Sequence, residues 1–109
     1  MYVDREHLDV MADGDEVFMK DLIQIFIDDS NERIDRFPSL ISSKDYDILI
    51  REFHTLKGSA SNVGASVIQG LAKDLEKAAE ESNLEQIKEL LNKFKDEYDK
   101  TKLELEALL

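Results

Sequence analysis

The sequence predicts an all-α fold, an antiparallel four-helix bundle with a short additional N-terminal helix. Apolar residues recur at three- and four-residue spacing almost throughout, and no alternating strand pattern of convincing length occurs. The chain contains one Pro and only four Gly, so few residues interrupt helices. Its 109 residues, 42% of them hydrophobic, suit one domain over residues 1–109 with a single core.

The composition narrows the classes of function. Asp and Glu number 25 against 14 Lys and Arg, which gives a net charge of −11. We therefore expect no nucleic-acid partner, because such a chain does not neutralise phosphates in bulk. The absence of cysteine excludes disulfides, thiolate chemistry and cysteine-type zinc sites. No signal-peptide pattern and no apolar run of about 18 residues occur, so we expect a cytoplasmic protein without membrane contact.

Two helices are predicted before the middle of the chain. A short one covers Asp4–Ala12, with Asp4 as its N-cap. A long one follows from about Asp15 to about Ile41, and Pro38 predicts a kink or a restart near residues 36–37, because proline lacks a backbone N–H. The apolar side of the long helix is wider than one packing contact requires. Either this helix is wedged between two others, or part of its apolar side is exposed to a partner. The apolar side consists of Phe18, Met19, Leu22, Ile25, Phe26, Phe37 and Leu40. Ile23, Ile27 and Ile34 extend it at one edge, which we call the shoulder.

Three further helices complete the predicted bundle. One runs from about Asp45 to about Val63 and stops at Gly64. The next begins at Ser66 with a predicted Ser66/Gln69 capping box, and the last begins with a predicted Ser82/Glu85 capping box. The last helix keeps a long apolar seam at Leu84, Ile87, Leu91, Phe94, Tyr98, Thr101, Leu105 and Leu108.

His54 is the strongest candidate for a chemically reactive residue. On a helical wheel it lies roughly 140° from the centre of the apolar stripe, so the helix presents the imidazole to water. Gly58, one turn on, removes a side chain beside the ring at a cost of about 1 kcal/mol relative to alanine. Lys57 and Arg51 supply positive charge three residues to either side. This combination suggests a histidine that is phosphorylated and approached by a large partner.

Other chemistries find little support. The chain has two histidines, no G-x-S-x-G motif and no P-loop, so neither a nucleophile triad nor direct use of ATP is predicted. Asp4 and His7 form a weak candidate for metal binding, and no metal site or cofactor of its own is expected.

The stretch from His54 to Ala65, HTLKGSASNVGA, resembles the signature of the histidine-containing phosphotransfer (HPt) domain family, H-x-L-K-G-[SA]-[SA]-x-x-[VIL]-G-A. Every constrained position matches. The resemblance extends to the run Leu22–Phe26 and to the pair Leu75-Glu76, and so covers about Asp15 to Glu80. The last helix matches in length and periodicity only.

The resemblance implies a phosphocarrier rather than an enzyme. His54 would accept a phosphoryl group on Nε2 from the aspartate of a receiver domain, in a hybrid sensor kinase or a response regulator, and pass it to another receiver. Lys57 would lie beside the phosphoryl group, and Gly58 would give the receiver access. Glu76 matches the position whose side chain bonds the histidine Nδ1 in chemotaxis-kinase members, and Lys73 is a further candidate near the phosphate. Mg²⁺ is expected on the partner receiver.

A docking surface is expected around His54, at Ile50, Arg51, Lys57, Gly58 and Ser61, together with the helix shoulder at Met19, Ile23 and Ile27. Alternatives to a phosphorelay carrier are a module that binds receivers without carrying phosphate, and a helical adaptor. The chain is either a free-standing protein, which Met1 favours, or a fragment of a hybrid kinase, and we expect a monomer.

Overall fold

The structure, a computed structural model, describes residues 2–109, so Met1 lies outside it. This part of the chain contains helices and no strand, which confirms the all-α prediction. No helix within residues 2–109 is both long and apolar enough to cross a membrane. The helices are α1 (Arg5–Met11), α2 (Glu16–Ser42), α3 (Tyr46–Asn62), α4 (Ser66–Glu80) and α5 (Leu84–Glu106).

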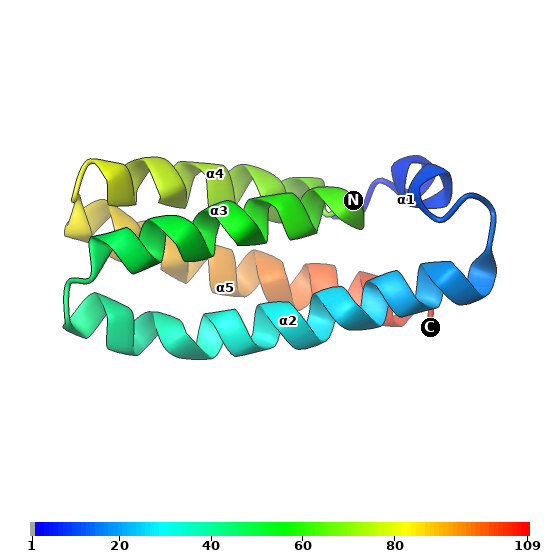
Figure 1. The fold of residues 1–109 in the computed structure, drawn as a ribbon, viewed down its shortest axis with the longest axis horizontal. Helices are drawn as coiled ribbons and strands as arrows, with labels where there is room; N and C mark the ends of the chain where they lie inside the picture. The colour runs from blue at the N-terminus through cyan, green and yellow to red at the C-terminus, as the bar shows by residue number, and fades with distance from the viewer. Residues whose placement is uncertain (1) are drawn as a thin grey trace.

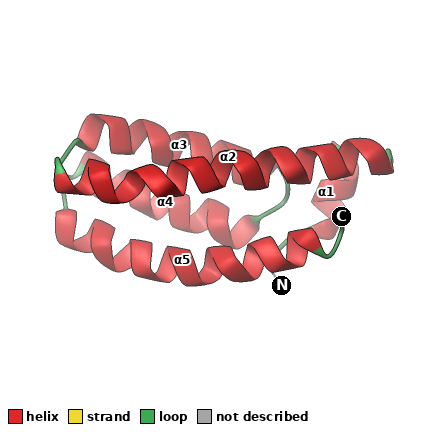
Figure 2. Ribbon diagram, turned by 90° about the horizontal axis from the view of Figure 1, so that it is seen from below, coloured by secondary structure: helices red, strands yellow, loops and turns green. Residues whose placement is uncertain are grey.

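Helices α2 to α5 lie lengthwise beside one another, and α1 lies at the end where α2 begins (Figures 1 and 2). Successive long helices run in opposite directions, because short turns join them (Figure 1). The assembly measures 42 × 21 × 19 Å. Its core takes one apolar face from each helix and includes the fully buried Phe37, Phe53 and Phe94.

Most helices begin at a side-chain cap, although two capping predictions were wrong. Asp15, Asp45 and Asn83 each accept a hydrogen bond from the backbone N–H three residues on. Ser66 is already the first residue of α4, where no side chain caps the helix. Asn83, not Ser82, caps α5, because Ser82 takes a left-handed backbone conformation (φ 52°) in the preceding turn.

The predicted restart of the long helix is also wrong, because α2 continues without interruption through Pro38. The residue before it, Phe37, is buried, and its ring packs against those of Phe53 (centroids 5.1 Å apart) and Phe94 (6.5 Å). These aromatic contacts stabilise the helical conformation at the point where the proline removes a backbone hydrogen bond.

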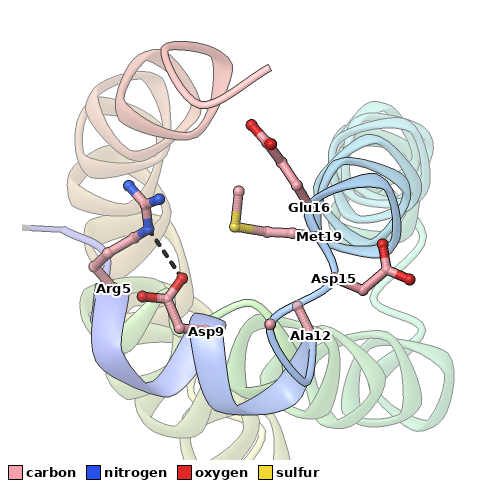
Figure 3. Close-up of a pocket in the computed structure, with 7 residues that line it drawn as sticks. Arg5, Asp9, Ala12, Asp15, Glu16 and Met19 are labelled. Carbon is pink, nitrogen blue, oxygen red and sulfur yellow. Dashed lines mark hydrogen bonds and ion pairs between the residues drawn. The ribbon is translucent and has the colours of Figure 1, made fainter.

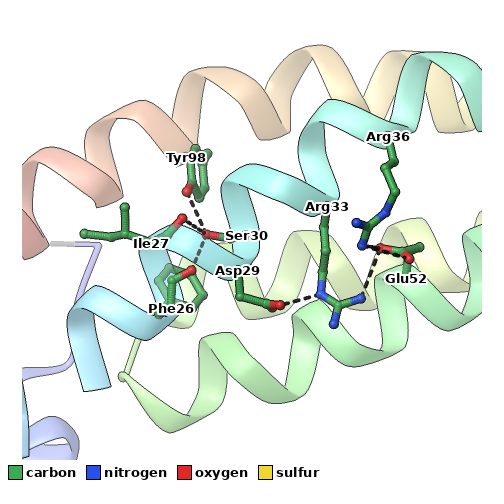
Figure 4. Close-up of polar contacts among 8 residues, drawn as sticks. All are labelled: Phe26, Ile27, Asp29, Ser30, Arg33, Arg36, Glu52 and Tyr98. Carbon is green, nitrogen blue, oxygen red and sulfur yellow. Dashed lines mark hydrogen bonds and ion pairs between the residues drawn. The ribbon is translucent and has the colours of Figure 1, made fainter. Parts of the chain in front are cut away.

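Two polar networks fix α2 against its neighbours (Figure 4). The hydroxyls of Ser30 and Tyr98 lie 2.6 Å apart and join α2 to α5. Arg33 and Arg36 both donate to Glu52, at 3.1 Å, and join α2 to α3. Burial raises the pKa of Tyr98 above its usual value, so this phenol stays protonated and able to donate at neutral pH.

The N-terminal segment closes one end of the molecule through a contact with the α3–α4 turn. The Asp4 N–H donates to the Gly64 carbonyl at 2.6 Å, and Val3 and Leu8 are buried. Gly64 has φ +70°, and a Cβ placed there would lie 2.5 Å from the Asp4 carbonyl oxygen. Glycine is therefore required here by both backbone conformation and space.

Replacing Gly64 by Ala is expected to lower the free energy of unfolding by about 2 kcal/mol or more, because left-handed strain adds to the overlap with Asp4. Gly14→Ala is the matched control, since Gly14 has φ +72° but open space around it, and it should cost only about 1 kcal/mol. Urea unfolding measures both. Equal losses in the two variants would contradict the packing role of Gly64.

Candidate functional site

His54 lies in the middle of α3 with its side chain 67% exposed. The opposite face of α3 is buried through Leu49, Phe53, Leu56 and Ala60. The structure therefore confirms that the helix buries its aliphatic side and presents this imidazole to solvent.

Glu76 on α4 bridges His54 and Lys57 of α3. Its Oε2 lies 2.8 Å from Nδ1 of His54, and its Oε1 accepts a hydrogen bond from Nζ of Lys57 at 2.7 Å. An ionised carboxylate only accepts hydrogen bonds, so Nδ1 carries the proton and Nε2 keeps its lone pair. The Glu76 side chain is only 14% exposed, which limits competition from water for these bonds.

The charge state of Glu76 follows from its surroundings. Burial alone would raise the pKa of this carboxyl group, but hydrogen bonds from Lys57 and His54 outweigh burial and hold the pKa below its ordinary value. Glu76 is therefore ionised at neutral pH and acts as a fixed acceptor for the imidazole N–H.

The space beside the imidazole is open. A Cβ added to Gly58 would meet no atom within 4 Å, so packing inside the chain does not explain this glycine. Arg51 and Lys73 are exposed, while Ile50 and Ser61 are half-buried, with Ile50 packed against the core. A partner that reaches His54 would meet an open helix surface with cations beside it.

The predicted shoulder of α2 is not available for docking. Met19, Ile23 and Ile27 are 6%, 0% and 5% exposed, so they belong to the core. The apolar side of α2 is covered on this flank and uncovered on the other, where Phe18 is 46% and Ile25 is 65% exposed. A charged residue at Ile23 or Ile27 would therefore disrupt the core instead of probing a partner surface.

Sequence reasoning missed the groove that follows from this arrangement. A hollow of about 290 Å³ lies between α2 and α3, with Ile25 and Leu22 on one side and Thr55, Ser59 and Asn62 on the other. Thr55 follows His54 directly, and on the α3 wheel Gly58 lies between His54 and this groove. The signal in the sequence was the excess width of the apolar side of α2.

A second hollow, of about 210 Å³, lies where α1 meets α2 (Figure 3). Arg5 and Asp9 form an ion pair at 3.3 Å beside it, and the Met19 side chain points into it. The Asp4 carboxylate, half of the predicted Asp4/His7 metal candidate, caps α1 by accepting from the His7 N–H. Within residues 2–109, no group of three or more His, Cys, Asp or Glu residues could hold a metal ion.

Comparison with known proteins places this geometry in a family. The model of the Hpt domain family matches residues 21–108. The structure superimposes on the crystal structure of histidine-containing phosphotransfer protein B (HptB) from Pseudomonas aeruginosa PAO1 with a TM-score of 0.90, covering 97% of this chain and 92% of that chain at 24% identity. No curated protein matches. Since the matched region contains His54, Lys57, Gly58 and Glu76 and spans most of the sequence, the chain belongs to the Hpt domain family.

Proposed function

We propose that this chain is a phosphorelay carrier that accepts a phosphoryl group on Nε2 of His54 from a receiver-domain aspartate and passes it to the aspartate of another receiver. One observation carries the proposal: His54 is largely exposed, and its Nδ1 is held by Glu76. The ring thereby directs its nucleophilic nitrogen outward. Membership of the Hpt family supports the same role.

The chemistry is a reversible exchange between two phosphorylated side chains. Nε2 attacks the phosphorus of the aspartyl phosphate, the P–O bond to the aspartate breaks, and the aspartate leaves as a carboxylate. The imidazole becomes positively charged, and Glu76 stabilises this charge through the Nδ1–H bond. Transfer to the next receiver reverses these changes, so no proton has to enter or leave Nε2.

Lys57 and Gly58 have separate roles in this proposal. Lys57 lies one turn from His54, and its amine, which donates to Glu76 in this structure, would turn towards the phosphoryl oxygens and offset their charge. Gly58 leaves the approach to the ring unobstructed. Lys73 and Arg51 extend the positive surface that a phosphorylated partner meets.

The remaining requirements are assigned to the partner. The Mg²⁺ needed for phosphoryl transfer belongs to the receiver, and this chain contributes the nucleophile, its orientation and a docking surface. We propose that it acts in the cytoplasm as a monomeric antiparallel four-helix bundle, with receivers of hybrid sensor kinases and response regulators as its partners.

The docking surface proposed here replaces the buried shoulder. It combines the His54–Gly58 surface of α3 with the α2–α3 groove and an apolar strip of α2, formed by the exposed Phe18 and Ile25 and the half-buried Leu22. These α2 residues are spaced at i, i+4 and i+7, so they form one continuous edge. An apolar face on a receiver would cover this edge while its aspartate reaches His54.

His54→Gln is expected to abolish phosphorylation, because glutamine lacks the nucleophilic nitrogen. The measurement mixes each protein with a phosphorylated receiver and follows acid-labile, alkali-stable label. His7→Gln is the control and should be labelled like the wild type. Label that persists in His54→Gln would contradict the assignment, and a wild-type chain that binds receivers without becoming labelled would identify a receiver-binding module instead.

Glu76→Gln is expected to slow phosphoryl transfer about tenfold at pH 7, because the neutral amide neither fixes the Nδ1–H tautomer nor stabilises the charged ring as well. Glu80→Gln, on an exposed position of the same helix, is the control and should leave the rate unchanged. Stopped-flow transfer from a phosphorylated receiver measures both variants.

The same variant has a predicted pH signature in stability. The pKa of Glu76 is lowered in the folded chain from its ordinary value of 4.5, so its ionised form stabilises the fold above about pH 4.5. This contribution is lost as the pH falls below 4.5 through the lowered pKa. The unfolding free energies of wild type and Glu76→Gln should differ at pH 7 and converge in acid; a constant difference would show that the carboxylate charge is not involved.

Ile25→Glu is expected to reduce kcat/KM for transfer from a receiver about tenfold without altering thermal stability, because Ile25 is exposed and lies in the proposed docking groove. Leu103→Glu introduces the same change at an equally exposed position of α5 and should have no effect. Equal rates for the two variants would place the receiver elsewhere.

A further inference from the structure

Residues of α2 and α5 line a further groove, the α2–α5 groove. It consists of two adjoining hollows of about 310 and 460 Å³ that share Lys95. No residue of α3 or α4, the helices that carry His54 and Glu76, lines either hollow. The groove is therefore separate from the phosphotransfer site.

Lysines follow the α5 edge of this groove at a regular interval. Lys88 and Lys95 line the first hollow, and Lys95 and Lys102 line the second. Seven residues turn a helix by about 700°, close to two full turns, so the three lysines share one side of α5 over about 21 Å. None of them forms an ion pair with any residue in the described part of the chain.

The first hollow combines positive charge with an apolar floor. Phe37, Pro38, Ile41 and Leu91 line it together with Asn92 and the two lysines, and no carboxylate does. Phe37 and Leu91 are buried, so the exposed Pro38 and the half-buried Ile41 supply the apolar surface that a partner can reach. The other hollow of the α2–α5 groove, of about 460 Å³, contains Asp35 and Asp99 beside its lysines. The Lys88–Lys95 end therefore has a cationic rim and no carboxylate in its lining, in a chain whose net charge is −11.

The shape and charge of this end select one kind of occupant. A small molecule buries most of its surface in an enclosed pocket, whereas this hollow continues into a neighbouring one along the helix axes. A concave strip with an apolar floor and a charged edge matches an amphipathic helix. We propose that the α2–α5 groove binds an acidic amphipathic helix of a partner protein, with apolar side chains over Pro38 and Ile41 and carboxylates at Lys88 and Lys95.

The overall charge of the chain makes this proposal testable with a simple probe. An acidic peptide is repelled by most of a surface of net charge −11, so its binding requires a local cationic site. The probe is a synthetic 18-residue peptide with leucines on one helical face and glutamates along both edges of that face. A peptide of the same composition with a scrambled order has the same charge but no apolar face.

Fluorescence anisotropy with the full chain measures binding of both peptides. The ordered peptide is expected to bind, the scrambled one to bind at least tenfold more weakly, and added salt to weaken binding. Lys88→Glu/Lys95→Glu should weaken binding of the ordered peptide tenfold or more. Lys77→Glu/Lys93→Glu, a pair at exposed positions outside this groove with the same change in net charge, should alter it less than twofold.

Three results would overturn the proposal. Equal weakening by the two double variants would show that binding follows net charge alone. Amide chemical shifts that move on α3 and α4 instead of α2 and α5 would place the peptide at the phosphotransfer site. Dimers in sedimentation that only Lys88→Glu/Lys95→Glu abolishes would show that the groove binds a second copy of this chain.

Discussion

The bridge made by Glu76 is the interaction on which the geometry of the candidate site depends. A single carboxylate, 2.8 Å from His54 and 2.7 Å from Lys57, fixes the imidazole from a neighbouring helix. The bridge requires α3 and α4 to approach closely. Ala72 and Ala79, four residues before and three after Glu76, are buried and small enough to permit that approach. The tautomer of His54 is therefore set by helix packing as much as by local chemistry.

Two glycines of the His54–Ala65 stretch serve this arrangement for different reasons. Gly58 has no neighbour within 4 Å, so it leaves space for something outside the chain. Gly64 adopts a positive φ and contacts the Asp4 backbone, so it sets where α3 stops and where the N-terminal segment closes the end of the molecule. The turn at Gly64 joins α3 to α4, the two helices that carry His54 and Glu76. The stretch thus encodes both access to the histidine and the packing that orients it.

The sequence was sufficient for the helices and for the exposure of His54, because both follow from the period of the apolar residues along single helices. It was insufficient for the docking surface. Met19, Ile23 and Ile27 and the opposite flank at Phe18 and Ile25 are equally apolar, and only the placement of the other helices decides which flank is covered. The cap of α5 was predicted wrongly for a similar reason. Ser82 and Asn83 are both good N-cap residues, and the conformation of the preceding turn decides between them.

The stability of the fold does not explain the exposed apolar residues of α2. An exposed isoleucine such as Ile25 buries little apolar area that could stabilise the fold. Its neighbours Phe18 and Leu22 extend the same edge beside the groove that leads to His54. Since folding does not account for this edge, a surface that a partner covers is the simpler physical reason for it.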